Sequence, residues 1–197
     1  MNTRRLACFL LGVWMGGGLL MAWVAAGSFS SVDRLMGRPH PLATLQFKAL
    51  GRTEARLLLR YQVSEQNRWN FEMWEVAQIV MGALFFFFVL LATRENKFAL
   101  LLILSMIAAV VVQRVMLTPA MISFGRLMDF VPPDAPSRDR TQFWVFHSWY
   151  WGVELTKWLL GLALCARLIS RRNRRSGDAR QQIDMVDKAN HRHVDGL

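Results

Sequence analysis

Four long apolar stretches, separated by polar connections, organise the chain. They cover residues 6–27, 71–93, 98–117 and 147–169. The hydrocarbon core of a bilayer is about 30 Å thick and takes roughly 20 helical residues to cross, so each stretch is long enough to span a membrane. The pattern predicts an all-α, integral membrane four-helix bundle over residues 1–170. Residues 171–197 are polar and basic, and they are predicted to form a disordered cytoplasmic tail.

The first stretch allows two interpretations. Arg4 and Arg5 precede an uncharged run from Leu6 to Gly27. This run is longer than the apolar part of a typical signal peptide, which favours a retained membrane helix. A secretory signal cleaved near Val24-Ala25-Ala26 is the alternative.

The connection over residues 28–70 carries its own pattern. Pro39-His40-Pro41 blocks regular structure, and from Leu42 onward leucines alternate with basic residues at helical spacing. We expect an amphipathic helix in this first extramembrane loop, lying at the membrane surface or capping the bundle. It can also continue almost directly into the second span. Pro119 is expected to end the third span.

Basic residues indicate the orientation. Four spans place both ends of the chain on one side, together with Arg4, Arg5, Arg94, Lys97 and the cluster 171–175. Positively charged connections stay in the cytoplasm, so we expect a multi-pass protein of a bacterial inner membrane with cytoplasmic N- and C-termini. The basic first connection argues in the opposite direction. The formal net charge of +10 suits anionic lipid head groups as partners, and no nucleic-acid-binding motif is present.

Several polar residues lie inside the predicted spans, where ionisable groups are costly and need a partner or a function. The topology places most of them in the outer half of the membrane, with Glu154 and Lys157 deeper. Lys157 follows Glu154 by three residues, within reach on a helix. The candidate binding cluster consists of Glu72, Glu75, Gln78, Gln113, Arg114, His147, Glu154 and Lys157.

Three interpretations of this cluster remain open. The charges of Glu75, Arg114, Glu154 and Lys157 sum to zero, which is typical of helices held together by ion pairs. A mid-membrane carboxylate such as Glu154 is also typical of a transport or proton path. A metal or haem site would use His147 with Glu75 or Glu72. The sequence predicts no cofactor and leaves a metal undetermined, and without a familiar catalytic motif an enzyme is the less favoured class.

Small residues in the first span suggest helix packing. Gly12 and Gly16 share one helix face and allow close approach of another helix, within the chain, in a homo-oligomer or in a partner protein. Cys8 and Cys165 fit neither a zinc motif nor a disulfide framework and are interpreted as small apolar residues. The sequence thus favours a small transport-related or accessory membrane protein with a polar pocket. A structural or interaction subunit is the alternative, and a metal- or haem-binding protein is the second alternative.

Three short motifs sit at the ends of the predicted spans. Gly12-Val13-Trp14-Met15-Gly16 opens the first, Leu117-Thr118-Pro119 ends the third and Phe146-His147 opens the fourth. In this layout Leu6–Ile169 resembles a bacterial membrane family of unknown function that is related to eukaryotic transmembrane protein 205. The resemblance implies four membrane helices and supplies no catalytic residues.

Overall fold

The computed structural model of the chain describes the backbone of residues 3–92, 97–131 and 137–194, and the side chains of residues 5–91, 97–131 and 137–169. The described part is helical apart from short turns and contains no strand. In chain order the elements are α1 (Thr3–Gly37), α2 (Pro41–Leu50), α3 (Arg52–Ala92), α4 (Lys97–Val112), the π-helical turn η1 (Gln113–Leu117), α5 (Thr118–Leu127) and α6 (Arg138–Val194).

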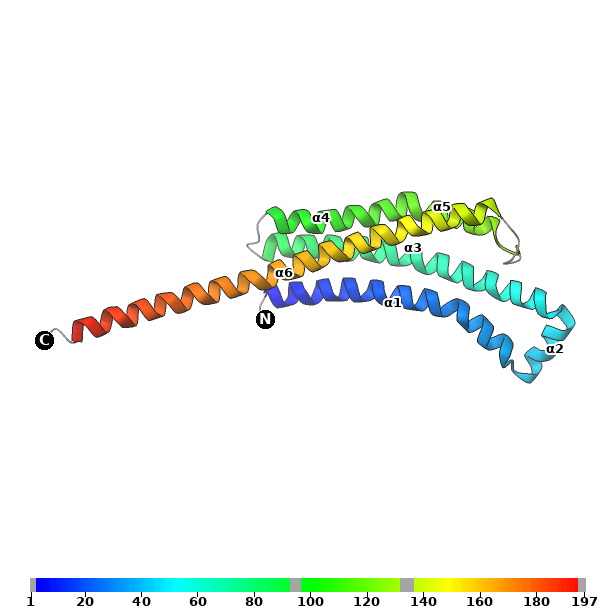
Figure 1. The fold of residues 1–197 in the computed structure, drawn as a ribbon, viewed down its shortest axis with the longest axis horizontal. Helices are drawn as coiled ribbons and strands as arrows, with labels where there is room; N and C mark the ends of the chain where they lie inside the picture. The colour runs from blue at the N-terminus through cyan, green and yellow to red at the C-terminus, as the bar shows by residue number, and fades with distance from the viewer. Residues whose placement is uncertain (1–2, 93–96, 132–136, 195–197) are drawn as a thin grey trace.

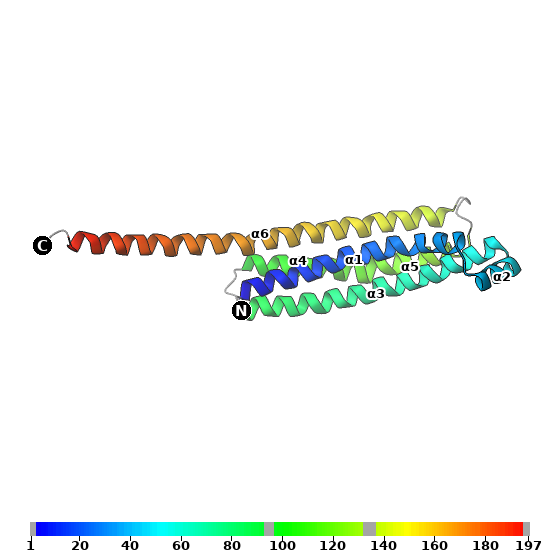
Figure 2. The same cartoon turned by 90° about the horizontal axis from the view of Figure 1, so that it is seen from below.

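The long helices lie side by side along one axis (Figures 1 and 2). The start of α1, the end of α3 and the start of α4 share one end of the bundle, where α6 continues outward alone (Figure 1). The short helix α2 closes the opposite end (Figure 1). The helices α1, α3, α4 and α6 thus run along the same axis, and α3 and α4 are antiparallel neighbours, as a short connection requires.

The apolar core runs between α1, α3, α4 and α6. Its buried members include Leu11, Phe85, Ile103 and Leu164. Large apolar side chains are also exposed along the outward faces of all these helices, as with Leu91 at 82%. A soluble protein rarely exposes so much contiguous apolar surface, whereas a bilayer covers it.

Three described helices are long and apolar enough to cross a membrane. They are Arg5–Gly37, Arg52–Leu91 and Lys97–Leu127, the last one combining α4, η1 and α5. The helix α6 is not among them, because Glu154 and Lys157 interrupt its apolar run. The sequence prediction of a helical membrane protein is thereby confirmed at the level of three candidate spans.

The first connection is more helical than the sequence pattern predicts. The helix α1 continues to Gly37 and α3 begins at Arg52, so residues 28–70 are interrupted only around residues 38–40 and at Gly51. At about 1.5 Å per residue, the 35 residues of α1 measure about 52 Å, well beyond a hydrocarbon core. A second, smaller cluster formed by Val32, Met36 and Ala55 packs these extensions together.

The chain reverses through two helix boundaries at this end. The helix α2 starts with Pro41, which suits a first helical position, and the His40 side chain accepts a hydrogen bond from the Leu42 backbone N–H at 3.3 Å. Gly51 separates α2 from α3 with φ +90°, a backbone conformation that favours glycine. Beyond this break α3 runs without interruption into the second apolar stretch, as the alternative prediction stated.

The prediction that Pro119 ends the third span is wrong. A π-helical turn at Gln113–Leu117 precedes it, in which the Thr118 backbone N–H donates to the Gln113 carbonyl, and α5 then continues to Leu127. Pro119 lies in the first turn of α5, where its missing N–H and fixed φ are tolerated. Because this turn uses hydrogen bonds between residues five apart, the helix continues beyond Pro119.

The basic C-terminal segment belongs to the last helix. The helix α6 extends to Val194 and so includes most of residues 171–197, whereas the disorder of this tail stays a prediction. The segment contains no proline after Pro136 and many residues of good helix propensity, including Arg, Ala, Gln and Lys. Such a composition supports helical continuation from an anchored helix despite the lack of apolar residues.

Candidate functional site

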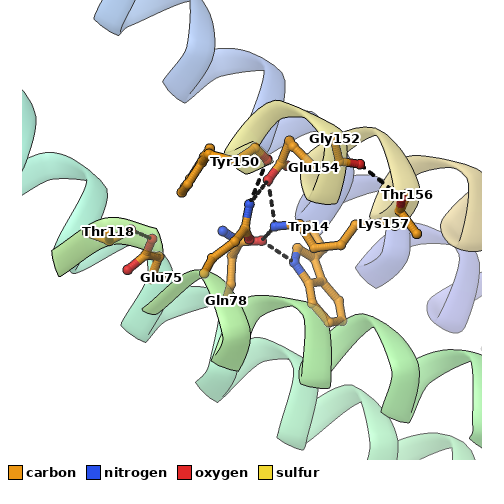
Figure 3. A network of polar contacts seen from close by, with 10 residues as sticks. Trp14, Glu75, Gln78, Thr118, Tyr150, Gly152, Glu154, Thr156 and Lys157 are labelled. Atoms are coloured by element: carbon orange, nitrogen blue, oxygen red, sulfur yellow. Dashed lines mark hydrogen bonds and ion pairs between the residues drawn. The ribbon is translucent and has the colours of Figure 1, made fainter. Parts of the chain in front are cut away.

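A buried ion pair on α6 is the centre of the polar cluster (Figure 3). The Lys157 Nζ atom lies 2.7 Å from Glu154 Oε2, as the three-residue spacing predicts. Lys157 is 3% exposed as a residue, and the Glu154 side chain is 16% exposed. Two ions this deeply buried stabilise a fold only when hydrogen bonds satisfy their remaining positions.

The amide of Gln78 on α3 supplies one of these hydrogen bonds. Its Oε1 accepts from Lys157 Nζ at 2.7 Å and from the indole Nε1 of Trp14 at 3.0 Å. Since both neighbours are obligatory donors, they fix the oxygen of Gln78 toward them and turn its Nε2 the other way. A single buried amide thus connects α1, α3 and α6 (Figure 3).

Gln113, which begins the π-helical turn, hydrogen-bonds with Glu154. Its Nε2 donates to Glu154 Oε2 at 3.1 Å and to the Tyr150 carbonyl at 3.4 Å. Its side chain is fully buried at 0% exposure. Glu154 and Lys157, which the sequence places deeper than the other members, therefore contact two of those members, Gln113 and Gln78.

A second group of polar side chains surrounds Glu75, one helical turn before Gln78. The Glu75 carboxylate is 0% exposed and accepts a hydrogen bond from the Thr118 hydroxyl through Oε1. Its Oε2 lies 3.9 Å from the Arg114 guanidinium, which also contacts Glu72 Oε1 at 3.3 Å. Glu72 and Arg114 are about one-third exposed, so this group reaches from the interior toward the surface.

Counting Glu72 changes the charge balance inferred from the sequence. Three carboxylates (Glu72, Glu75 and Glu154) face two cations (Arg114 and Lys157), which leaves one negative charge in excess within this cluster. The zero sum predicted from four residues is therefore incomplete, because Arg114 is shared between two carboxylates. A bound proton or cation would neutralise the difference.

Besides His147 Nδ1, three deeply buried polar atoms in the cluster have no hydrogen-bond partner among the described residues. They are Glu75 Oε2, Gln78 Nε2 and Gln113 Oε1. Buried polar groups are almost always hydrogen-bonded, so three such atoms on neighbouring side chains are unusual.

Glycines bring the helices close enough for these contacts. A Cβ added to Gly82 would lie 2.8 Å from Trp14 and from Ile107, and one added to Gly18 would lie 3.2 Å from Glu154 Oε1. The packing surface predicted from Gly12 and Gly16 is not used within the described bundle, because both positions face open space. The close contacts fall instead on Gly17, Gly18, Gly82 and Gly161.

His147 lies apart from the carboxylates. Its Nε2 accepts a hydrogen bond from the Trp151 indole at 3.0 Å, and its ring stacks on Phe143 with centroids 5.7 Å apart. The described residues contain no group of three His, Cys, Asp or Glu side chains suited to a metal ion. Among the described residues no hydrogen bond or ion pair joins His147 to Glu72 or Glu75, and the metal or haem site stays a prediction.

A second, outer ion-pair group was not predicted from the sequence. The Arg68 guanidinium forms a bidentate pair with Asp129, with both N–O distances at 2.9 Å, and also contacts Glu65. A pocket of about 680 Å³ lies beside it between α3 and α5, and Glu72 is part of its lining. Glu72 thus connects this pocket to the buried cluster through Arg114.

Trp14, Thr118 and Tyr150 belong to the site although the sequence analysis did not select them as binding residues.

The chain matches no protein-family model, and comparison with curated proteins and with solved structures gives no match either. The geometry of the site is consequently the basis for any functional conclusion.

Proposed function

We propose that the protein is a small, transport-related membrane protein that moves protons along the buried polar cluster. Four helices span the membrane in this proposal. The fourth is α6, which packs along α1, α4 and α5 and presents apolar residues such as Leu155 and Leu159 outward, at 62% and 60% exposure. Its two mid-span charged residues, Glu154 and Lys157, are paired with each other and largely buried, which lowers the cost of placing them in lipid.

The orientation in this proposal follows from the shared end of the bundle. Arg5 lies in the first turn of α1 and Lys97 begins α4 at the same end of the bundle, and the Arg171–Arg175 cluster belongs to the part of α6 that continues outward from this end (Figure 1). The positive-inside rule favours a cytoplasmic location for this end, in a bacterial inner membrane, with anionic lipid head groups around it. The pocket beside Glu72 then lies toward the outer side.

One observation carries the proposed activity: the polar cluster, counted with the partly exposed Glu72, has one carboxylate more than it has cations. A cluster of ion pairs that served only to hold helices together would be balanced in charge. A cluster that exchanges protons needs a carboxyl group whose charge is not permanently compensated. Glu75 meets this condition, because its nearest cation, Arg114, lies 3.9 Å away and is shared with Glu72. Glu154, which is paired with Lys157, is the next carboxylate along the bundle.

The contacts suggest a route. Glu72 lines the outer pocket, Arg114 bridges Glu72 and Glu75, and Gln113 and Lys157 surround Glu154 further along the bundle. Protons enter from the pocket through Glu72 and reach the interior at Glu75. Transfer from there to Glu154 takes them across the central part of the bundle.

Proton flux into liposomes tests this proposal. The purified protein is reconstituted with an internal pH-sensitive dye, and a potassium gradient with valinomycin supplies the driving force. Wild type should acidify the lumen faster than protein-free liposomes, and Glu75→Gln and Glu154→Gln should each abolish the difference. The exposed Glu54→Gln change on the same helix α3 serves as the matched control and should leave flux unchanged.

Folding is checked by gel filtration and circular dichroism of each variant in detergent. Equal flux in wild type, Glu75→Gln and Glu154→Gln, with all three folded, would overturn the proposal. Should a glutamine variant fail to fold, Glu75→Asp or Glu154→Asp keeps the charge and shifts its position. Either aspartate variant should then lower the flux without abolishing it, and unaltered flux contradicts the proposed role.

A structural or interaction subunit is the second candidate, and the exposed glycine pair favours it. Gly12 and Gly16 face open space on α1, so another membrane helix can approach there, from a second copy or from a partner protein. In this case Gly12→Leu with Gly16→Leu should remove a co-purifying chain while the bundle stays folded. The glutamine variants of Glu75 and Glu154 should then change only the amount of protein.

A further inference from the structure

The polar cluster consists of two halves that meet at Gln78 and Glu75. In the first half Gln78 and Gln113 hydrogen-bond with the Lys157–Glu154 pair. In the second half Glu75 contacts Thr118 and Arg114. Glu75 and Gln78 share one face of α3, because residues three apart on a helix are neighbours.

The two glutamines have fixed orientations. Gln78 Oε1 already accepts from Trp14 and Lys157, and Gln113 Nε2 already donates to Glu154 and to the Tyr150 carbonyl. Exchanging the amide oxygen and nitrogen would place a donor against the donors around Gln78, or an acceptor against the acceptors around Gln113. Neither amide can therefore turn to give its remaining atom a hydrogen bond. Each leaves one polar atom for a further partner.

The three unpartnered atoms have a definite chemistry. Gln78 Nε2 is a donor, whereas Gln113 Oε1 and Glu75 Oε2 are acceptors. All three side chains are at least 99% buried, so bulk solvent does not supply the partners. One donor and two acceptors match a water molecule, which accepts at its oxygen and donates through both hydrogens.

We propose that one buried water molecule is bound between Glu75, Gln78 and Gln113. It accepts a hydrogen bond from Gln78 Nε2 and donates to Gln113 Oε1 and Glu75 Oε2. Three hydrogen bonds are the usual number for an internal water. A metal ion does not fit this position, because the amide N–H of Gln78 is a donor and would point its hydrogen at the cation.

This water deepens the proposed function, and its role as part of a proton path rests on that function. It joins Glu75 to Gln113, whose amide contacts Glu154, so the two carboxylates become connected through one water and one side chain. Binding of the water depends only on the hydrogen-bond geometry. It can therefore be measured without any transport assay.

Water contact at Gln78 is measured by NMR on protein labelled with ¹⁵N at glutamine side chains in detergent micelles. Gln78→Leu identifies the Gln78 amide signal by its loss. In wild type this amide should show a cross peak with water whose sign corresponds to a long-lived bound molecule, unlike the exposed Gln66 amide on the same helix. The Gln113→Leu variant should lose that cross peak and keep the Gln78 signal, whereas Gln66→Leu should leave it unchanged.

Two results overturn the inference: a folded wild type without the cross peak, or a Gln113→Leu variant in which it is undiminished. If Gln113→Leu does not fold, Gln113→Asn shortens the side chain and should remove the cross peak in the same way. The cross peak without proton flux means that the proposed function fails alone. Proton flux without the cross peak means that the water site fails alone.

Discussion

The indole of Trp14 donates a hydrogen bond to the side-chain oxygen of Gln78 across 3.0 Å, and this contact joins the first and third helices inside the apolar core. Trp14 is 3% exposed, and its ring lies against the backbone at Gly82. The position of one large aromatic ring therefore depends on a glycine one helical turn away from its hydrogen-bond acceptor. Packing and polar contact are coupled at this point.

Enlarging Gly82 should disturb this arrangement, whereas enlarging Gly12 should not. Gly82→Val places side-chain atoms where a Cβ already lies 2.8 Å from Trp14, so the indole must move and the bundle should lose about 1–3 kcal/mol of stability. Gly12→Val meets nothing within 4 Å and should stay within about 0.5 kcal/mol of wild type. Unfolding by sodium dodecyl sulfate in mixed micelles measures both. Equal losses in the two variants would show that α1 does not pack on Gly82.

The Lys157–Glu154 pair provides a second prediction. Lys157→Met leaves the Glu154 carboxylate in the interior without its cation, and removing one partner of a buried pair costs about 3–5 kcal/mol. The double change Lys157→Met with Glu154→Leu removes both charges and should recover most of that loss in the same unfolding titration. The exposed Lys48→Met change is the matched control. A double variant no more stable than the single one argues against a direct pair.

The membrane orientation can be checked with reporter fusions. A periplasm-active reporter such as alkaline phosphatase should be active after Leu50 and inactive after Arg94, and a cytoplasm-active reporter should show the reverse. The reason is that the basic helix ends favour the cytoplasm and lie at the end opposite α2. The opposite pattern would invert the direction of the proposed proton path. If neither reporter is active after Leu50, both fusions are repeated after Arg38, which lies in the same connection.

Local spacing accounts for the parts of the site that could be predicted from the sequence. The Lys157–Glu154 contact follows from residues three apart on one helix, and the apolar stretches define the helices themselves. Contacts such as Trp14–Gln78 and Thr118–Glu75 depend on how each helix is rotated against a distant one. A single sequence contains no direct signal for that rotation.

The glycines illustrate the same limit. Gly12 and Gly16 have the spacing of a packing motif, yet Gly17 and Gly18 make the close contacts with Trp74 and Glu154. A spacing identifies a face that permits close approach, and the remaining side chains decide whether that face is turned inward. The resemblance to the family related to transmembrane protein 205 and the inner-membrane location stay predictions.

The π-helical turn at Gln113–Leu117 changes the phase of the third span. In α4 the buried positions 99, 102, 103, 106 and 110 lead to position 113 at the usual intervals, and the next buried positions are 118 and 125. Five residues along an ordinary α-helix correspond to a rotation of about 140°, so Gln113 and Thr118 could not both face inward without the additional residue in this turn. One extra residue in the backbone thus keeps the glutamine beside Glu154 and the threonine beside Glu75 on a single continuous helix. The polar contacts of the cluster therefore depend on the one additional residue in this helical turn.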